Sequence, residues 1–300
     1  MSATVKGGLH LTLAASIWGG MYVVSKYTLD VVPPLTFLFI RYLLALTLLL
    51  ALCRKEKQPV FPGRQRWLLL QIGLFGYFFS IAAQFIGTKL SSAHMGALIT
   101  TLSPVFLSLF AIIMLKEKMT GKQAAATLLA LFGVILVLNP DRSSLHTAGS
   151  LGNMVLVLAA LFWGYYSALA RKAATSFSAL QVTTCGILIA AILSLPFVFI
   201  EAHEWNWAAL LRPSILGGVL YVSFISTALA FFSWNKGLSL VPAHQAGLFF
   251  FFQPLVGVLL SWLVLKEQIT GYFFAGGVLI LLGVYLSMGG SASKKASDTD

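Results

Sequence analysis

The sequence predicts an all-α, polytopic membrane protein with ten transmembrane helices in two inverted five-helix repeats. Hydrophobic residues make up 58% of the 300 residues and charged residues only 10%, whereas soluble domains carry roughly 25% charged residues. Ten apolar runs approach the length of about 20 residues that a spanning helix needs. One segment of the first half also recurs in the second half, as in membrane proteins built from two similar halves.

The spans follow from the apolar runs taken in chain order. They lie at about 8–30, 35–53, 67–88, 93–115, 121–138, 150–171, 178–200, 213–235, 242–265 and 271–289. The runs lack the alternating pattern of β-barrel strands, so helices, which satisfy their own backbone, are the remaining way to cross a bilayer. We expect a first repeat over 1–140, a second repeat over 150–289 and a disordered cytoplasmic tail over 290–300.

The basic residues predict the orientation of the chain. Ten spans put both termini on one side, which carries 14 of the 20 Lys and Arg residues; five lie on the other side, and Arg41 lies within a span. By the positive-inside rule, both termini are cytoplasmic and the protein is integral to the cell (inner) membrane. The net charge of +11 then belongs to loops that touch anionic lipid, and we expect no nucleic-acid partner.

The cysteines give no sign of a cofactor. Cys53 and Cys185 lie in or at the end of apolar runs, and no Cys/His cluster has the spacing of metal ligands. We therefore expect no disulfide, no metal and no cofactor.

The repeat is clearest in the segments 93–121 and 243–271. Both begin Ala-His, carry a proline at the same place (Pro104 and Pro254) and end Leu-Lys-Glu followed by Thr-Gly. Trp-Gly pairs also recur, at 18–19 and 163–164. Because each half holds an odd number of spans, the second half crosses the membrane in the opposite sense, an arrangement that suits alternating access.

The order of these motifs carries a family resemblance. The residues concerned are Trp18-Gly19, Lys26, Pro34, Arg41, Ser103-Pro104, Lys116-Glu117 and Thr120-Gly121, then Trp163-Gly164, Pro254, Glu267 and Thr270-Gly271. The pattern resembles the EamA-like branch of the drug/metabolite transporter superfamily. The resemblance implies ten helices, termini inside, a central cavity lined mostly by helices 1, 3, 4, 6, 8 and 9, and carriers of amino acids and other small metabolites, often exporters.

The second half departs from this pattern at one position. Gly186 stands where a counterpart of Arg41 would lie, so Arg41 is not a symmetric element. A charge inside a span marks a functional site by default, but snorkelling to the outer face or binding to helix-end carbonyls is an equal alternative. The role of Arg41 stays open at this point.

Aromatic residues are the candidates for a substrate pocket. Five tryptophans (Trp67, Trp205, Trp207, Trp234 and Trp262) lie at or near span ends, as in aromatic belts. Trp18 and Trp163 lie deeper, with Tyr22 and Tyr166 on the same helix faces. The predicted substrate-binding residues are Trp18, Tyr22, Tyr77, Trp163, Tyr166, Tyr221 and the buried amide Gln253. Packing of large side chains between helices is the alternative.

The prolines and histidines of the repeated segment are candidates for gating. A proline in mid-span removes a backbone hydrogen bond, so Pro104 and Pro254 are either moving hinges or static kinks. His94 and His244 begin their spans at opposite faces, which predicts twin gates at the two mouths. Interfacial residues that cap the helix starts are the alternative.

These features favour a carrier of a small organic metabolite that works by alternating access. By resemblance it is an exporter of amino acids or similar metabolites, with the lipid bilayer as its other partner and an open oligomeric state. Asp30, Glu117 and Glu267 all lie at span ends and no Asp or Glu lies deeper in a predicted span, which predicts facilitated transport or exchange without proton coupling. If protons are coupled, the histidines are the expected carriers, or Glu117 or Glu267. The alternative is an intramembrane enzyme acting on a lipid or hydrophobic substrate, but no catalytic motif is present. A channel is a third possibility, without a filter-like motif to support it.

Overall fold

The computed structural model describes residues 2–61, 63, 65–91, 93–138, 150–204, 208, 211–265 and 271–289. The predicted tail at 290–300 and the motif residues Lys266, Glu267 and Thr270 lie outside the described residues. The side chains of Lys26, His94 and Trp262 do so as well.

The first half of the chain is helical from its start. Its elements are α1 (Ala3–Leu29), α2 (Pro34–Lys55), α3 (Arg66–Gln71), η1 (Ile72–Phe79), α4 (Ser80–Leu90), α5 (Ala93–Thr100), α6 (Ser103–Leu115) and α7 (Gly121–Leu138). Helices α3, η1 and α4 follow one another without a break, and η1 is a π-helical stretch.

The second half repeats this order. Its elements are α9 (Ser150–Ala173), α10 (Ala179–Ile200), the 3₁₀ turn η2 (Glu201–Glu204), α12 (Pro213–Leu220), η3 (Tyr221–Leu229), α13 (Ala230–Leu240), α14 (Ala243–Phe249), α15 (Phe252–Leu265) and α16 (Gly271–Gly289). A second π-helical stretch, η3, lies between α12 and α13, as η1 lies between α3 and α4. In the described part of the chain, every regular element is a helix.

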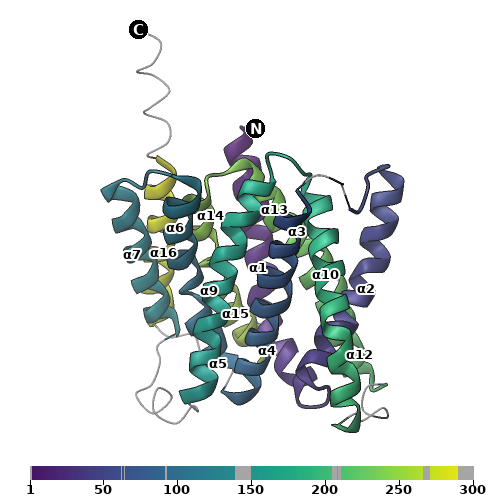
Figure 1. The fold of residues 1–300 in the computed structure, drawn as a ribbon. Coiled ribbons are helices and arrows are strands. Elements are labelled where there is room, and N and C mark those ends of the chain that lie inside the picture. Colours follow the sequence, from purple (N-terminus) through teal and green to yellow (C-terminus); the bar gives the residue numbers. More distant parts are fainter. Residues whose placement is uncertain are drawn as a thin grey trace.

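The helices lie side by side as a bundle (Figure 1). Five of them, counting α3–η1–α4 and α12–η3–α13 as one helix each, are long and apolar enough to cross a membrane. Shorter apolar helices lie at Ser103–Leu115, Gly121–Leu136 and Phe274–Leu286. The all-α prediction is thus confirmed for the described residues, while the count of ten spans stays a prediction.

Side-chain carboxylates, hydroxyls and amides cap the starts of two helices. Helix α2 starts at the Pro33-Pro34 pair, where a missing N–H costs nothing, and the Glu201 carboxylate accepts hydrogen bonds from the N–H groups of Leu35 and Thr36 at 3.2 and 2.7 Å. Helix α10 begins with a capping box in which Ser178 and Gln181 each accept a bond from the other's backbone N–H. These caps fix the ends of long apolar helices.

The two prolines at equivalent positions of the repeat follow interruptions of their helices. Helix α5 ends at Thr100 and α6 begins at Ser103, and likewise α14 ends before α15 begins at Phe252. Pro104 lies in the first turn of α6, where proline is tolerated because its N–H would be unpaired anyway. The sequence predicts a hinge or a kink at these prolines, and the structure shows two separate helices at each.

Close contacts between glycines show how the two halves meet. Helices α7 and α16 lie side by side (Figure 1). A methyl group placed on Gly133 would lie 2.7 Å from the carbonyl oxygen of Gly276, and one on Gly283 would lie 2.7 Å from that of Ala126. Gly133 and Gly283 are equivalent positions of the 150-residue repeat, as are Ala126 and Gly276, so the two contacts are copies of one another. A two-fold axis between the halves produces this pattern.

The same reciprocity holds at the centre of the bundle. Helix α1 packs against α15, and α9 packs against α6. A methyl group on Gly19 would lie 3.0 Å from Cβ of Val256, and one on Gly164 would lie 2.6 Å from Cβ of Phe106. The glycines of the two Trp-Gly pairs therefore allow close helix approach, which brings Trp18 and Trp163 toward each other.

Candidate functional site

A small cavity lies among the middles of these helices. Its volume is about 20 Å³, far below the roughly 300–1,000 Å³ of pockets that hold drug-sized ligands, so binding of a solute requires the cavity to widen. The lining residues are Trp18, Met21 and Tyr22 of α1, Arg41 of α2, Ser80, Ile81 and Gln84 of α4, Thr100 and Ser103 at the first helix break, Ala159 and Trp163 of α9, Phe231 of α13, and Phe250 and Gln253 at the second break. The elements include those that the resemblance implies, with α2 added through Arg41.

The two tryptophans at equivalent positions of the repeats form one wall. Their ring centroids are 5.0 Å apart and the planes are perpendicular, at 89°, which is a favourable edge-to-face arrangement. Phe250 lies 6.0 Å from Trp18 and 5.8 Å from Trp163. The indole N–H of Trp18 donates to the carbonyl oxygen of Ser226 at 2.9 Å. Trp18, Trp163 and Gln253 are thus brought to one cavity, while their role in substrate binding stays a prediction.

Trp234 corrects an expectation. Its place near the end of a predicted span suggested an aromatic belt, but its side chain is fully buried and its ring lies 5.6 Å from that of Trp18. The predicted span ended at residue 235, whereas helix α13 continues to Leu240. Trp234 therefore lies deeper than the apolar run indicated, and its indole N–H donates to the Ser167 hydroxyl at 3.2 Å.

The cavity also has a polar side. The hydroxyls of Tyr22 and Thr100 are 2.6 Å apart, so Tyr22 contacts the first helix break. Among the lining residues, buried polar atoms without a hydrogen-bond partner include Oγ of Ser103, Nε1 of Trp163 and Oε1 of Gln253. A site with aromatic walls and a few such polar atoms is suited to a small amphipathic solute.

Three predicted tyrosines have hydroxyls that the protein itself partners. The hydroxyls of Tyr77 and Tyr166 are 3.1 Å apart and both bind the Asn235 side chain, at 2.9 Å each. Tyr221 donates to the carbonyl oxygen of Ile17 at 2.7 Å. None of the three is among the lining residues of the cavity described above. Their substrate-binding role stays a prediction that the geometry does not single out.

Arg41 is the lining residue whose role the sequence left open. Its side chain is 0% exposed, so it does not snorkel to the surface. Its Nε donates to Oγ1 of Thr227 at 2.7 Å, and the guanidinium carbon lies 5.3 Å from the centre of the Phe85 ring. The second repeat has no counterpart of Arg41. At the equivalent position, Gly186, the Tyr77 ring fills the space, because a methyl group on Gly186 would lie 2.5 Å from that ring.

The gating candidates lie at the helix breaks and at one end of the bundle. A methyl group on Gly247 of α14 would lie 3.3 Å from Cα of Pro104, so α14 packs against the first break. Pro254 follows the lining residues Phe250 and Gln253. The hinge roles of Pro104 and Pro254 stay predictions, and the predicted gate at His94 falls on a side chain outside the described residues.

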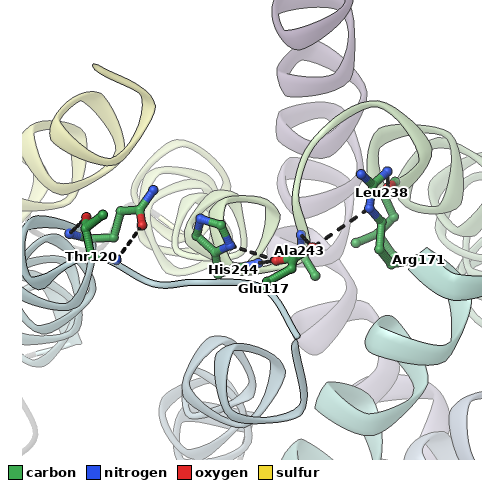
Figure 2. Close-up of polar contacts among 7 residues, drawn as sticks. Glu117, Thr120, Arg171, Leu238, Ala243 and His244 are labelled. Atoms are coloured by element: carbon green, nitrogen blue, oxygen red, sulfur yellow. Dashed lines mark hydrogen bonds and ion pairs between the residues drawn. The ribbon is translucent and has the colours of Figure 1, made fainter. Parts of the chain in front are cut away.

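His244 binds a carboxylate from the other half of the chain. Its Nδ1 lies 2.7 Å from Oε2 of Glu117, just after α6 (Figure 2). The same carboxylate accepts hydrogen bonds from the backbone N–H groups of Ala243 and His244, at 3.1 and 3.3 Å. Glu117 therefore caps the start of α14 and joins the Lys-Glu end of one repeated segment to the Ala-His start of the other.

Electrostatics strengthen this contact, which we call the Glu117–His244 latch. Burial alone would raise the pKa of the Glu117 carboxyl, but the hydrogen bonds from the His244 side chain and from the two backbone N–H groups outweigh it and lower the pKa. Arg171 adds a positive charge, with its Nε 4.0 Å from Oε1 of Glu117 and its Nη1 donating to the Leu238 carbonyl oxygen at 2.8 Å (Figure 2). The latch thus joins α6, α9, α13 and α14.

The latch lies at the end of the bundle where α1 begins. A methyl group on Gly7 would lie 2.5 Å from the Val241 side chain, and Val241 precedes α14 by two residues. Thr120, which exchanges backbone-to-side-chain hydrogen bonds with Gln123 at the start of α7, lies near the latch (Figure 2). The sequence predicts a gate at His244, which stays a prediction; it does not predict the contact with Glu117, because contacts between the two repeats are not visible in either copy alone.

The chain is similar over nearly its whole length to known proteins. The chain is 27% identical over 295 residues to "Uncharacterized transporter YetK" of Bacillus subtilis, covering 94% of this chain and 87% of that protein. It is 26% identical to a "Probable amino-acid metabolite efflux pump" of Escherichia coli, covering 97% of both chains. A solved structure described as "Crystal structure of protein" superposes with a TM-score of 0.80 at 19% identity over 94% of this chain and 96% of its own, which shows the fold alone.

The family pattern agrees with the internal repeat. The sequence pattern that defines the EamA-like transporter family matches residues 5–139 and, a second time, residues 150–289. The relatives are named as transporters and efflux pumps rather than as enzymes. With its apolar helices, the chain is an integral, multi-pass membrane transporter, and it belongs to the EamA-like transporter family.

Proposed function

We propose that the protein is a carrier that exports amino acids or similar small metabolites by alternating access. Its ten spans form two inverted repeats, over 1–140 and 150–289, in the cell membrane, with both termini and the tail at 290–300 in the cytoplasm. The observation that carries the proposal is the cavity, because equivalent residues of the two repeats and both helix breaks meet there. A site shared by two inverted halves is the arrangement that alternating access uses.

The latch supplies one gate in this mechanism. While Glu117 holds His244, α6 and α14 are joined at the end where α1 begins, which by the positive-inside rule is the cytoplasmic mouth. Opening that mouth requires the latch to break. The helix breaks before Pro104 and Pro254 leave the half-helices free to tilt without straining a continuous helix.

The direction and the substrate class rest on the relatives. The Escherichia coli and Salmonella typhimurium proteins named as probable amino-acid metabolite efflux pumps are each 26% identical to this chain, over at least 95% of both chains. The aromatic wall and the unpartnered polar atoms of the cavity support a small solute with both an apolar and a polar end.

Counterflow in reconstituted vesicles tests this proposal. Vesicles loaded with one unlabelled amino acid at high concentration should take up the labelled form transiently above equilibrium. A carrier that has released an unlabelled molecule outside binds a labelled one there and brings it in, while the unlabelled amino acid inside competes with its exit. Trp163→Ala should reduce the uptake at least tenfold, whereas Trp67→Ala, whose side chain is 69% exposed, should leave it unchanged. A panel of the common amino acids that gives no counterflow with the wild-type protein would contradict the substrate class.

A further inference from the structure

We propose that Arg41 binds the carboxylate of the transported solute in the cavity. This inference rests on the proposed function and names the chemical group that the site recognises. The Arg41 guanidinium has more hydrogen-bond donors than partners. Arg41 is fully buried, and only its Nε has a hydrogen-bond partner, the Thr227 hydroxyl. Both terminal nitrogens, Nη1 and Nη2, are buried without any partner in the protein.

The surroundings do not neutralise this charge. Arg41 is the one charged residue among the residues described as lining the cavity, and no Asp or Glu in the described part of the chain forms an ion pair with it. The rings of Tyr42 and Phe85 lie 5.5 and 5.3 Å from the guanidinium carbon, which gives only partial compensation. A buried cation without an anion is costly, so its retention requires a benefit other than stability.

The geometry of the guanidinium suits one kind of ligand. Nη1 and Nη2 present parallel N–H donors that match the two oxygens of a carboxylate. The hydrogen bond from Nε to Thr227 and the flanking Phe85 ring hold the guanidinium plane in place. A single arginine in an otherwise uncharged site favours one negative charge over a phosphate dianion, which usually meets several cations.

The remaining unpartnered atoms extend the fit to a zwitterion. Oε1 of Gln253 is a buried acceptor without a partner, and it lines the same cavity as Arg41. It is suited to receive a hydrogen bond from an ammonium group, which the faces of Trp18 and Trp163 also attract. The cavity thus offers donors for a carboxylate and an acceptor for an amine between aromatic walls.

A comparison of acids with their amides tests Arg41 separately from transport. The probes are L-phenylalanine and L-leucine, each paired with its carboxamide, and the readout is the ligand-induced rise in unfolding temperature of the purified, full-length protein. The wild-type protein should bind at least one acid tenfold or more tightly than its amide. In Arg41→Gln this preference should fall to less than twofold, and Arg41→Lys should keep part of it. Arg212→Gln, at the exposed start of α12, should keep all of it.

The outcomes separate the two proposals. A wild-type protein that binds the amides as tightly as the acids, or binds neither, overturns the role of Arg41, as does an Arg41→Gln variant that keeps the preference. Acid preference without counterflow would instead contradict the carrier function and leave Arg41 supported. A control without ligand tests whether Arg41 instead stabilises the fold. Arg41→Met should unfold at the same temperature as the wild type or higher, whereas replacing an arginine with a purely structural role would lower that temperature.

Discussion

Replacement of Glu117 by Gln isolates the contribution of the Glu117–His244 latch. The carboxylate accepts two backbone N–H groups and contacts Nδ1 of His244 at 2.7 Å. Glutamine has the same shape, but it keeps one acceptor oxygen and loses the negative charge. Losing a hydrogen bond to a charged group costs about 1.5–3 kcal/mol. Since about 1.4 kcal/mol is a factor of ten in an equilibrium constant, the cytoplasmic mouth should open at least tenfold more often.

Labelling of a cysteine in the cavity measures this opening. Ser103 lines the cavity, so Ser103→Cys in a Cys53→Ser, Cys185→Ser background reports access. A membrane-impermeant maleimide applied on the cytoplasmic side should label it about tenfold faster when Glu117→Gln is added. Glu56→Gln removes an exposed carboxylate after α2 and should leave the rate unchanged. Equal rates with and without Glu117→Gln would refute the latch as a gate.

Three other outcomes concern stability in detergent. Because the folded-state pKa of Glu117 lies below its ordinary value of 4.5, its stabilisation is complete above that pH and is lost as the pH falls through the folded pKa. The gap in unfolding temperature between wild type and Glu117→Gln should therefore shrink toward zero in acid, and a gap independent of pH would count against it. Gly19→Ala places a methyl group 2.5 Å from a carbonyl oxygen of α15 and should cost about 1–3 kcal/mol. Gly217→Ala, with no atom within 4 Å, should not lower the unfolding temperature. Trp18→Phe leaves the Ser226 carbonyl oxygen without its donor and should cost about 1 kcal/mol, and an unchanged denaturation curve would show that this bond adds nothing.

The helices and the repeat can be predicted because both follow from the order of residues within short segments of the chain. Apolar runs of sufficient length give helices in lipid, and the Trp-Gly pairs, which lie 145 residues apart, put Trp18 and Trp163 at equivalent points of the two halves. The repeat also identifies Pro104 and Pro254, although not that each lies just after a break between two helices.

The details of the site depend on contacts that no local pattern contains. Arg41 could not be assigned, because whether a charge inside a helix snorkels or stays buried is decided by neighbours such as Thr227 and Phe85. Trp234 was placed too near a surface because polar residues such as Asn235 end an apolar run without ending the helix. The position of Tyr77 near mid-span and the helix face that Tyr166 shares with Trp163 predict pocket residues, but the two hydroxyls bind each other and Asn235.

The reciprocal packing of α1 on α15 and of α9 on α6 bears on which parts of the molecule can move together. Each half contributes its first helix to the opposite half's proline-interrupted pair. A rigid body that keeps the tight contact at Gly19 must contain α1 and α15, and one that keeps the contact at Gly164 must contain α9 and α6. In the alternating-access mechanism that we propose, each moving unit therefore combines helices of both sequence repeats, and the boundary between the units runs through each half instead of through the linker that joins the halves.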